Sequence, residues 1–383
     1  MKRVSILLSL SALAFAGCAT VPREAGFADV ERSVADRSGG KKIRWHRGGE
    51  ADREVAAELD RLLDEELTAG GAVQIALLNN RRLQATYEDL AIAQADLVAA
   101  GLLSNPIFDA QARFADGGTN LDLGIAQNFI ELLYLPLHKH MAGAAFEAAK
   151  LRVTGEVLAL AGQVRRAFIS HQAALQTLEM RAQAATALEA SSDLARRLRE
   201  AGNIIELDFA NERAAYEQAR VDLHAAEVSV AQQRETLNDL LGLWGRRTTW
   251  TAAERLPEIP SGESSADSLE RRAIERNLLL AAARFDMEQA AGRAGIEASF
   301  GAFPDGEFGA TAEREEGEWS AGPSLELPLP LFNQGQPARA AALAEYRRAR
   351  EQHAALAVEI RARVRAAYIA VIAARERAMH YKT

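Results

Sequence analysis

The chain has 383 residues, with 45 Lys and Arg against 53 Asp and Glu, which gives a formal net charge of −8. The basic residues are interspersed with acidic ones, so the chain lacks the basic patch typical of nucleic-acid binding, and we expect no nucleic-acid partner. Beyond the first residues, no run of about 18 apolar residues occurs, so the sequence offers no candidate transmembrane helix. Any membrane-spanning part would have to consist of strands.

The N-terminus has the pattern of an export signal. Lys2 and Arg3 precede an apolar stretch from 4 to 15, and Ala16 and Gly17 stand directly before Cys18. Residues 1–17 are therefore predicted to be a signal peptide. Because Cys18 is the only cysteine, we expect it to carry a lipid rather than a disulfide, and we expect sorting to the outer membrane. The alternative is an ordinary signal with an incidental cysteine.

The next part of the chain is predicted to pass from a tether to helices. Residues 18–49 mix charge, Gly and Ser and are predicted to form a lipidated, extended tether. Apolar residues recur at helical spacing in 50–67 and again in 71–103, with Thr68 placed to cap the second helix. Asn105-Pro106 should end it, because proline disfavours helical geometry at the residue before it.

A two-residue period follows, which predicts a β-hairpin. Apolar and polar residues alternate over 108–114 and again over 121–129, around the Gly-rich turn 115–120. The hairpin should therefore have one apolar and one polar face.

A long helix is predicted from about His138 to the turn at Gly202-Asn203. About sixty residues at 1.5 Å each would span roughly 90 Å, far more than a globular helix, which favours a conduit or stalk. A second helix is predicted over 206–241, and 246–266 is interpreted as a compact connecting segment.

The motifs then recur, which indicates an internal repeat. Ala76–Leu83 resembles Ala273–Leu280, and Val164–Ile169 resembles Val364–Ile369, at nearly the same separation. A second hairpin lies between the later members, with strands predicted over 298–310 and 318–327. The first repeat is assigned to 50–245 and the second to 267–383. The second ends at Thr383 inside a helix, so we expect either a truncated sequence or a natural short form.

Four amphipathic strands cannot close a barrel, and lipid does not tolerate a free sheet edge. Three copies would supply twelve strands, an even number suited to an outer-membrane barrel. The alternative is two hairpins folded onto a soluble core. In the barrel interpretation, the lipid-facing residues are Leu121, Leu123, Ile125, Phe129, Trp319, Leu325 and Leu327. The lumen-facing residues are Asp122, Asn128, Ser324 and Glu326.

Several segments resemble the TolC-type outer-membrane efflux proteins. They are Gln74–Ala85, the strand entry Gly101–Pro106, the tip Ala201–Asp208 and the strand exit Leu327–Gly335. The resemblance covers most of the chain from about residue 70. It implies a mainly α fold with β-hairpins, in which three protomers build a twelve-stranded barrel continuous with a long periplasmic α-helical barrel. It also implies a membrane-fusion adaptor docked on the helical tips and an inner-membrane transporter beyond it.

On that resemblance the chain is an outer-membrane channel of a tripartite efflux pump, conducting substrates from the periplasm to the exterior. The alternative is a lipid-anchored periplasmic coiled-coil protein with a structural or adaptor role and no pore. The sequence does not separate drugs, metal ions and secreted proteins as substrates.

The turn that joins the two long helices of the first repeat is the candidate docking site for the adaptor. Gly202 permits the turn, while Ile204 and Leu207 offer apolar contact; the alternative is a hairpin turn without a partner. The full predicted tip consists of Gly202, Asn203, Ile204, Leu207 and Asp208.

Motifs of enzymes do not occur. The sequence has neither G-x-S-x-G nor H-E-x-x-H, and no Walker-type phosphate loop. His138 and His140 are two residues apart, a weak metal pattern, and are interpreted as part of a basic cluster near the membrane interface. We expect no catalytic residues, no metal and no cofactor.

Overall fold

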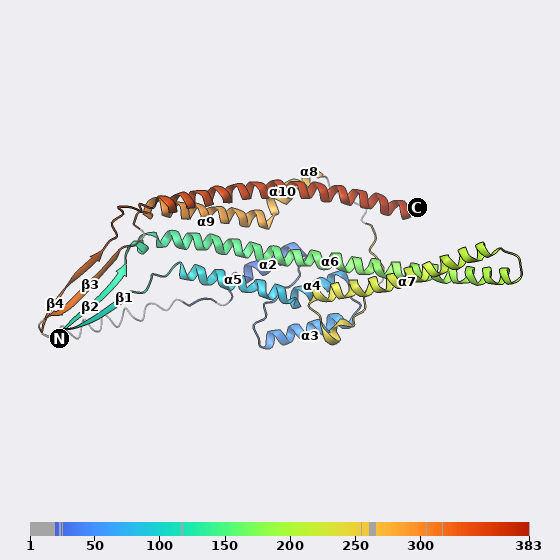
Figure 1. Ribbon diagram of the computed structural model, residues 1–383, viewed down its shortest axis with the longest axis horizontal. Coiled ribbons are helices and arrows are strands. Elements are labelled where there is room, and N and C mark those ends of the chain that lie inside the picture. The colour runs from blue at the N-terminus through green and yellow to red at the C-terminus, as the bar shows by residue number, and fades with distance from the viewer. Residues whose placement is uncertain are drawn as a thin grey trace. The chain divides into compact units, whose positions relative to one another are not determined.

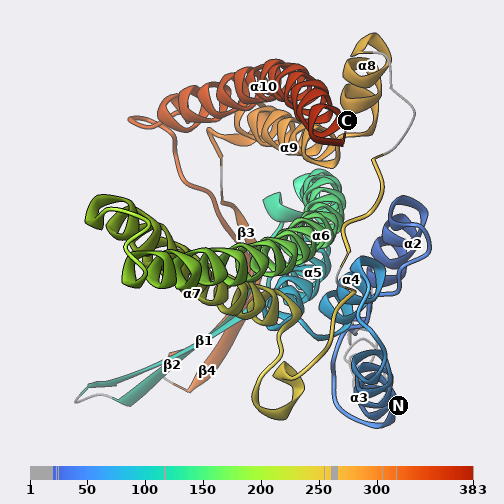
Figure 2. The ribbon, with the colours of Figure 1, turned by 90° about the vertical axis from the view of Figure 1, so that its right-hand side faces the viewer.

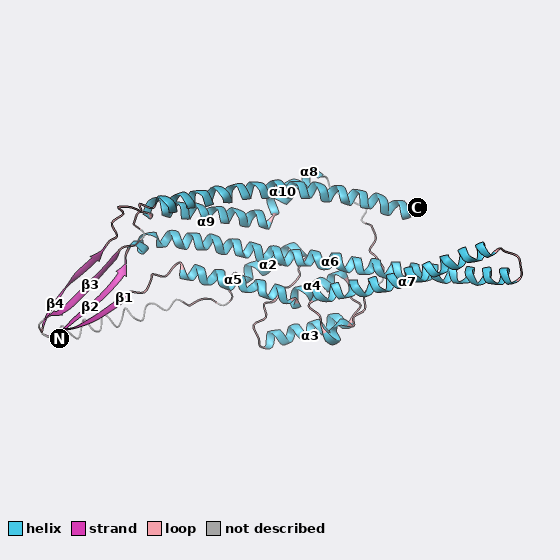
Figure 3. Ribbon diagram, in the orientation of Figure 1, coloured by secondary structure: helices cyan, strands magenta, loops and turns pink. Residues whose placement is uncertain are grey.

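The computed structural model describes residues 20–22, 24, 26–115, 118–253, 255–259, 266–303, 305–315 and 317–382. The predicted signal peptide and Cys18 lie outside these residues. Figure 1 shows the elements in chain order, and Figure 3 shows that the strands lie together while the other elements are helices. The chain divides into two compact units. One contains 88–153 and 264–383 with the residues up to 29; the other contains 30–87 and 154–263.

The first unit contains one antiparallel sheet. Its strands are β1 (Ile107–Ala115), β2 (Gly118–Asn128), β3 (Glu307–Glu315) and β4 (Glu318–Glu326), in the order β1-β2-β3-β4. The two predicted hairpins are therefore joined, because β2 pairs with β3 from Leu121–Arg314 to Asn128–Glu307. Gly309 permits this approach, since a Cβ there would collide with the carbonyl of Ile125.

The third strand begins later than predicted. Residues 298–300 complete the helix α9 (Leu278–Phe300), and β3 starts only at Glu307. The helix continues because its Ala-rich sequence favours helical geometry up to Gly301, whose N–H still bonds the carbonyl of Glu297.

The helix after the first hairpin begins earlier than predicted. α6 runs from Ile130 to Glu200, and the side-chain oxygen of Asn128 accepts a hydrogen bond of 3.2 Å from the N–H of Glu131 at its start. Pro136 lies inside the helix. Its ring fixes a φ angle that suits a helix, although it lacks the N–H that would donate to the preceding turn. The cap supplied by Asn128 sets the start of the helix at Ile130 rather than at His138.

The second half of this unit consists of α8 (Ala266–Arg276), α9 and α10 (Gln336–Lys382). Figure 2 shows α9 lying against α10. Ion pairs fasten α10 to both shorter helices, with 3.3 Å between Arg293 and Glu345 and 3.2 Å between Arg365 and Glu270.

The predicted helix 71–103, which begins in the second unit and ends in the first, is two helices. α4 (Ala69–Asn79) follows the capping side chain of Thr68, as predicted, and α5 (Arg81–Ala99) follows a break at Asn80. The break has a reason. The amide of Asn80 accepts from the N–H of Leu83 at 3.0 Å and donates to the carbonyl of Leu240 at 2.9 Å.

Leu240 belongs to the last turn of α7 (Glu206–Leu241), whose bounds agree with the prediction. Asn79 donates to the carbonyls of Leu241 and Gly242 at 2.9 and 2.8 Å. The final carbonyls of a helix have no partner within the helix, so the Asn79-Asn80 pair satisfies the end of α7.

The segment predicted as an extended tether includes a helix, α2 (Phe27–Ser38), with Val30 and Val34 fully buried. The prediction of a wholly extended segment is therefore wrong for these residues, because the two valines, four apart, form an apolar stripe that a helix can bury.

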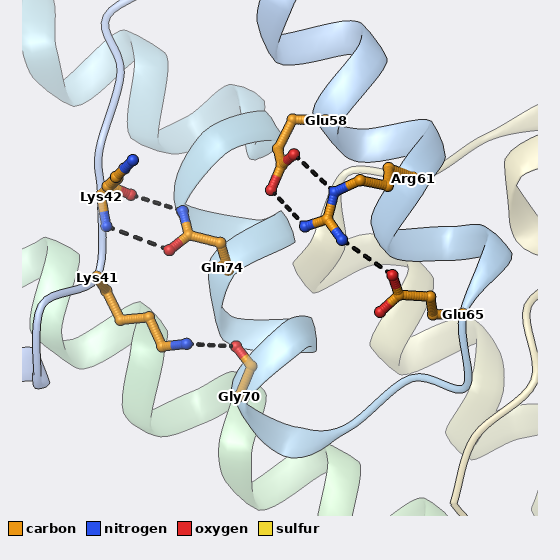
Figure 4. A network of polar contacts seen from close by, with 7 residues as sticks. All are labelled: Lys41, Lys42, Glu58, Arg61, Glu65, Gly70 and Gln74. Atoms are coloured by element: carbon orange, nitrogen blue, oxygen red, sulfur yellow. Dashed lines mark hydrogen bonds and ion pairs between the residues drawn. The ribbon is translucent and has the colours of Figure 1, made fainter.

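Residues 41–46 after α2 are extended and held by glutamines. Gln74 accepts from the N–H of Lys42 and donates to its carbonyl, while Lys41 Nζ donates to the carbonyl of Gly70 (Figure 4). Gln84 accepts from the N–H of His46 at 2.7 Å and donates to the carbonyl of Arg44.

α3 (Glu50–Asp64) carries its own surface ion pairs. Arg61 reaches Glu58 at 2.8 Å and Glu65 at 2.9 Å (Figure 4). All three side chains are largely exposed, so these pairs stabilise the helix only slightly.

The described helices include none that is both long and apolar enough to cross a membrane.

The two halves of the chain share a local feature. Asn277, the residue that matches Asn80 in the sequence repeat, separates α8 from α9 and accepts from the N–H of Leu280 at 2.9 Å. Both asparagines have nearly the same backbone angles, φ −64° and ψ 122° for Asn80 and φ −73° and ψ 119° for Asn277. This agreement supports the internal repeat.

We predict that Asn80→Ala lowers the free energy of unfolding by about 2–3 kcal/mol, because it leaves the buried N–H of Leu83 and the part-buried carbonyl of Leu240 unpaired. Asn277→Ala should lower it by about 1 kcal/mol, since in the described chain this side chain supplies the cap bond alone. Urea denaturation followed by circular dichroism measures both. Equal losses would contradict the role given to Asn80.

Candidate functional site

The sheet has one apolar and one polar face. Residues directly opposite one another in paired strands point to the same side, so the register assigns each residue to a face. The apolar face consists of Phe108, Ala110, Ala112, Phe114, Thr119, Leu121, Leu123, Ile125, Gln127, Phe308, Ala310, Ala312, Arg314, Trp319, Ala321, Pro323 and Leu325. In the single chain this face is uncovered at many points: Phe114 is 83% exposed and Phe108 is 69% exposed.

The opposite face is polar and acidic. It carries Asp109, Gln111, Arg113, Asn120, Asp122, Asn128, Glu307, Thr311, Glu313, Glu315, Glu318, Ser320, Ser324 and Glu326. Arg113 is the one basic residue on this face within the described strands. It pairs with Asp122 and lies 3.9 Å from Glu313. The carboxylates outnumber this arginine, so the face has a net negative charge.

The strand residues predicted from the sequence lie on the faces that the alternation of apolar and polar residues predicts. Two of them lie just outside the strands. Leu121, Leu123, Ile125, Trp319 and Leu325 lie on the apolar face. Phe129 and Leu327 lie one residue beyond the ends of β2 and β4, where both approach the space beside Gly306. The predicted lumen residues Asp122, Asn128, Ser324 and Glu326 lie on the polar face.

The predicted turn between α6 and α7 has the geometry of a glycine-terminated helix. Gly202 has φ 74°, and its N–H bonds the carbonyl of Arg199 at 2.9 Å. The N–H of Asn203 bonds the carbonyl of Leu198 at 2.8 Å. Together these two bonds form a Schellman motif, which requires a left-handed residue and therefore favours glycine.

Polar contacts fasten the two helices of this hairpin at intervals. Arg199 and Glu206 form an ion pair of 2.8 Å across the tip, and the Arg199 guanidinium lies 4.8 Å from the centre of the Phe209 ring. Farther from the tip, Ser191 donates to Glu212 at 2.7 Å. The side chains of Arg181 and Asp222 are 3.1 Å apart.

The apolar contribution of the tip differs from the prediction in one residue. Leu207 is 63% exposed, as a docking residue should be, whereas Ile204 is half-buried. Ile205, which was not predicted, is 64% exposed. The remaining predicted tip residues, Gly202, Asn203 and Asp208, are exposed. The sequence does not predict which of the two neighbouring isoleucines is exposed, because the turn geometry decides which of them points inward.

An open groove of about 630 Å³ runs along the same hairpin. Its lining joins apolar and aromatic side chains to charges of both signs, so it suits a partner segment with mixed polarity. The lining residues are Thr186, Glu189, Ala190, Ser192, Asp193, Arg196, Phe209, Arg213, Tyr216 and Glu217. No sequence pattern indicated this groove, because its residues come from two helices and are interleaved with buried ones.

The histidine pair 138 and 140 does not gather metal ligands. His140 lies 3.5 Å from Glu288 on α9. Within the described part of the chain, no group of three or more His, Cys, Asp or Glu side chains is arranged to hold a metal ion.

The sequence and the fold were compared with those of known proteins. No family model matches the chain. Over 322 residues it is 28% identical to the outer membrane protein OprJ of Pseudomonas aeruginosa, covering 77% of this chain and 64% of OprJ. It is 24% identical over 296 residues to the cobalt-zinc-cadmium resistance protein CzcC of Cupriavidus metallidurans, covering 76% and 69% of the two chains. The chain thus spans just under two thirds of the length of OprJ.

The outer membrane channel CmeC of Campylobacter jejuni has a similar structure, with a TM-score of 0.60 at 13% identity. The match covers 90% of this chain and 75% of CmeC. The resemblance predicted from the sequence is confirmed: the chain is similar in sequence to OprJ and CzcC, and its mainly helical fold with a four-stranded sheet is similar to that of CmeC.

Two glycines of the second unit, Gly155 and Gly202, allow a matched test of the turn after α6. An added Cβ meets nothing within 4 Å at Gly202 or at Gly155, but Gly155 is inside α6, whereas Gly202 has φ 74°. Gly155→Ala should raise the free energy of unfolding by about 0.5–1 kcal/mol, because alanine favours the helix. Gly202→Ala should lower it by roughly 1 kcal/mol, because of left-handed strain. Urea denaturation of both variants measures the difference; changes of the same sign would refute the assigned turn.

Proposed function

We propose that this protein is the outer-membrane channel of a tripartite efflux pump and conducts solutes from the periplasm to the exterior. The observation that carries the proposal is the two-faced sheet, apolar on one side and acidic on the other. The relationship to OprJ and CzcC supports it. In this proposal the sheet lies in the outer membrane, the helices extend into the periplasm, and Cys18 carries the lipid anchor.

The sheet by itself is incomplete. Among the described strands β1 and β4 each have one neighbour, so a row of backbone N–H and carbonyl groups at each edge has no partner strand there. Lipid does not tolerate such edges. Three copies pairing β4 of one with β1 of the next would form twelve strands without an edge. The proposed assembly is therefore a homotrimer.

Closure would give the faces their functions. With the apolar face outward, Leu123, Ile125 and Trp319 contact lipid. With the polar face inward, Asp122, Ser324 and Glu326 line a water-filled lumen, where carboxylates remain hydrated. The reverse orientation would bury the acidic face in hydrocarbon, which costs several kcal/mol for each charge.

A pair of arginine substitutions, one on each face of the sheet, tests this orientation. Leu123 lies between Ala110 and Ala312 on the apolar face, whereas Thr311 lies between Gly124 and Gly322 on the polar face. Leu123→Arg should cost about 2–4 kcal/mol in the bilayer and abolish assembly, while Thr311→Arg should be tolerated.

The measurement is the amount of heat-resistant trimer in the outer-membrane fraction. Equal tolerance of both variants would reject the assigned lipid face. A wild-type protein that is released as a soluble monomer once its lipid is removed would instead favour the structural protein without a pore.

The tip of the α6–α7 hairpin is proposed to dock a periplasmic membrane-fusion adaptor, which links the channel to an inner-membrane transporter. The exposed Ile205 and Leu207 supply apolar contact, and the groove beside them supplies charges of both signs. The Arg199–Glu206 pair and the Schellman motif hold this surface in one conformation, which lowers the ordering cost of binding.

Gly245 provides a matched control for a docking test at Gly202. Gly202 and Gly245 both have positive φ, 74° and 62°, and open space around them, but Gly245 lies outside the hairpin. Gly202→Trp should abolish cross-linking to the adaptor in cells and leave trimers intact, while Gly245→Trp should keep the cross-link. Undiminished cross-linking of the Gly202 variant would sink the docking assignment.

A further inference from the structure

The segment that follows α7 is held onto the second unit by a small set of bonds. We define residues 248–253 as the latch segment. Leu67 N–H donates to the carbonyl of Thr251 at 2.8 Å, and Ala253 N–H donates to the carbonyl of Leu67 at 3.2 Å. From α6, Gln172 donates to the carbonyls of Ala253 and Arg255 at 2.7 and 2.9 Å.

Trp250 is the buried centre of the latch segment. It is 2% exposed, and its indole N–H donates to Asn238 Oδ1 at 2.8 Å. The guanidinium of Arg234 lies 4.5 Å from the centre of the indole ring and donates to the carbonyls of Trp250 and Thr248. The latch segment therefore depends on one arginine, which interacts with both its backbone and its aromatic ring.

His171 of α6 packs against the same tryptophan. Its ring is 5.2 Å from the Trp250 ring in an edge-on arrangement, and the residue is 3% exposed. The Nδ1 atom is buried and has no hydrogen-bond partner among the described residues. Burial first, and the charge of Arg234 second, hold the pKa of His171 below its ordinary value.

The groups that face His171 offer no compensation for a proton. α7 presents the positive Arg234, the latch segment presents the neutral indole of Trp250, and its own helix presents the neutral amide of Gln172. A charged imidazole would therefore be buried beside a second cation, and the described groups that face it include no carboxylate to balance it.

We propose that His171 makes the docking of the latch segment acid-sensitive, so that protonation of its ring releases residues 248–253 from α6 and α7. This is a property of the second unit alone and is independent of the proposed channel function. Its consequence is that residues 248–253 loosen from the rest of the second unit in mild acid.

The direction follows from linkage. Above the ordinary histidine pKa of about 6.5, the ring is neutral in both the docked and the released state, and docking is fully stable. As the pH falls through about 6.5, His171 binds a proton in the released state but stays neutral in the docked state. The released population then rises up to roughly ten-fold for each pH unit until the lowered pKa of the docked histidine is reached.

Amide hydrogen exchange of the full-length protein tests the proposal. Protection of the Ala253 amide and of the Trp250 indole N–H is compared at pH 7.5 and 5.5, after correction for the intrinsic exchange rate. We expect protection of the wild-type latch segment to fall up to about ten-fold at pH 5.5, while amides in the middle of α7 keep theirs.

Two neutral substitutions, His171→Gln and His171→Phe, should remove this acid dependence. His224→Gln is the control, because His224 is exposed on α7 and faces Glu227 at 3.3 Å; it should behave as the wild type. Equal acid loss in the His171 variants, or loss spread over α7, would overturn the proposal. If both variants fail to fold, constant protection of the wild type between the two pH values would overturn it as well.

Discussion

The pairing of β2 with β3 is the interaction on which the arrangement of the first unit depends. It joins a hairpin near residue 120 to one near residue 315 and fixes which residue of one stands opposite which residue of the other. A slip by one position would turn every side chain of the second hairpin to the opposite face. Because the register is in phase, apolar residues from all four strands share one face and the carboxylates share the other. The close approach at Gly309 makes this phase possible.

The helices are ordered by the requirement that their end groups find partners. α7 ends against Asn79 and Asn80, whose amides bond its last carbonyls, and α6 ends in a Schellman motif at Gly202. These contacts fix where each helix stops more firmly than the weak ion pairs along the exposed helix surfaces do. The hairpin of α6 and α7 can therefore present its tip in a defined conformation even though most of its side chains are exposed.

The second unit buries its larger apolar side chains where several segments meet. Trp250, Phe168 and Tyr87 are fully or almost fully buried there, whereas the tip side chains Ile205 and Leu207 are not. Stability is thus concentrated around the latch segment and the extended residues 41–46, which Gln74 and Gln84 hold by paired amide bonds. In this way the unit anchors two long helices while leaving the tip accessible.

The sequence by itself determined the periodic features. Alternation over 108–114 and 121–129 fixed the hairpin and its faces, and the helix bounds at Glu206 and Leu241 followed from the glycines that flank them, because these signals are local. The tertiary structure decided what depends on distant partners. The break at Asn80 places its amide against the carbonyl of Leu240, which no local pattern specifies. α2 is helical because its valines are buried, and Ile205 rather than Ile204 is exposed because of the turn geometry. The joining of the two hairpins into one sheet is equally non-local, since no pattern within either hairpin specifies which strand lies beside it.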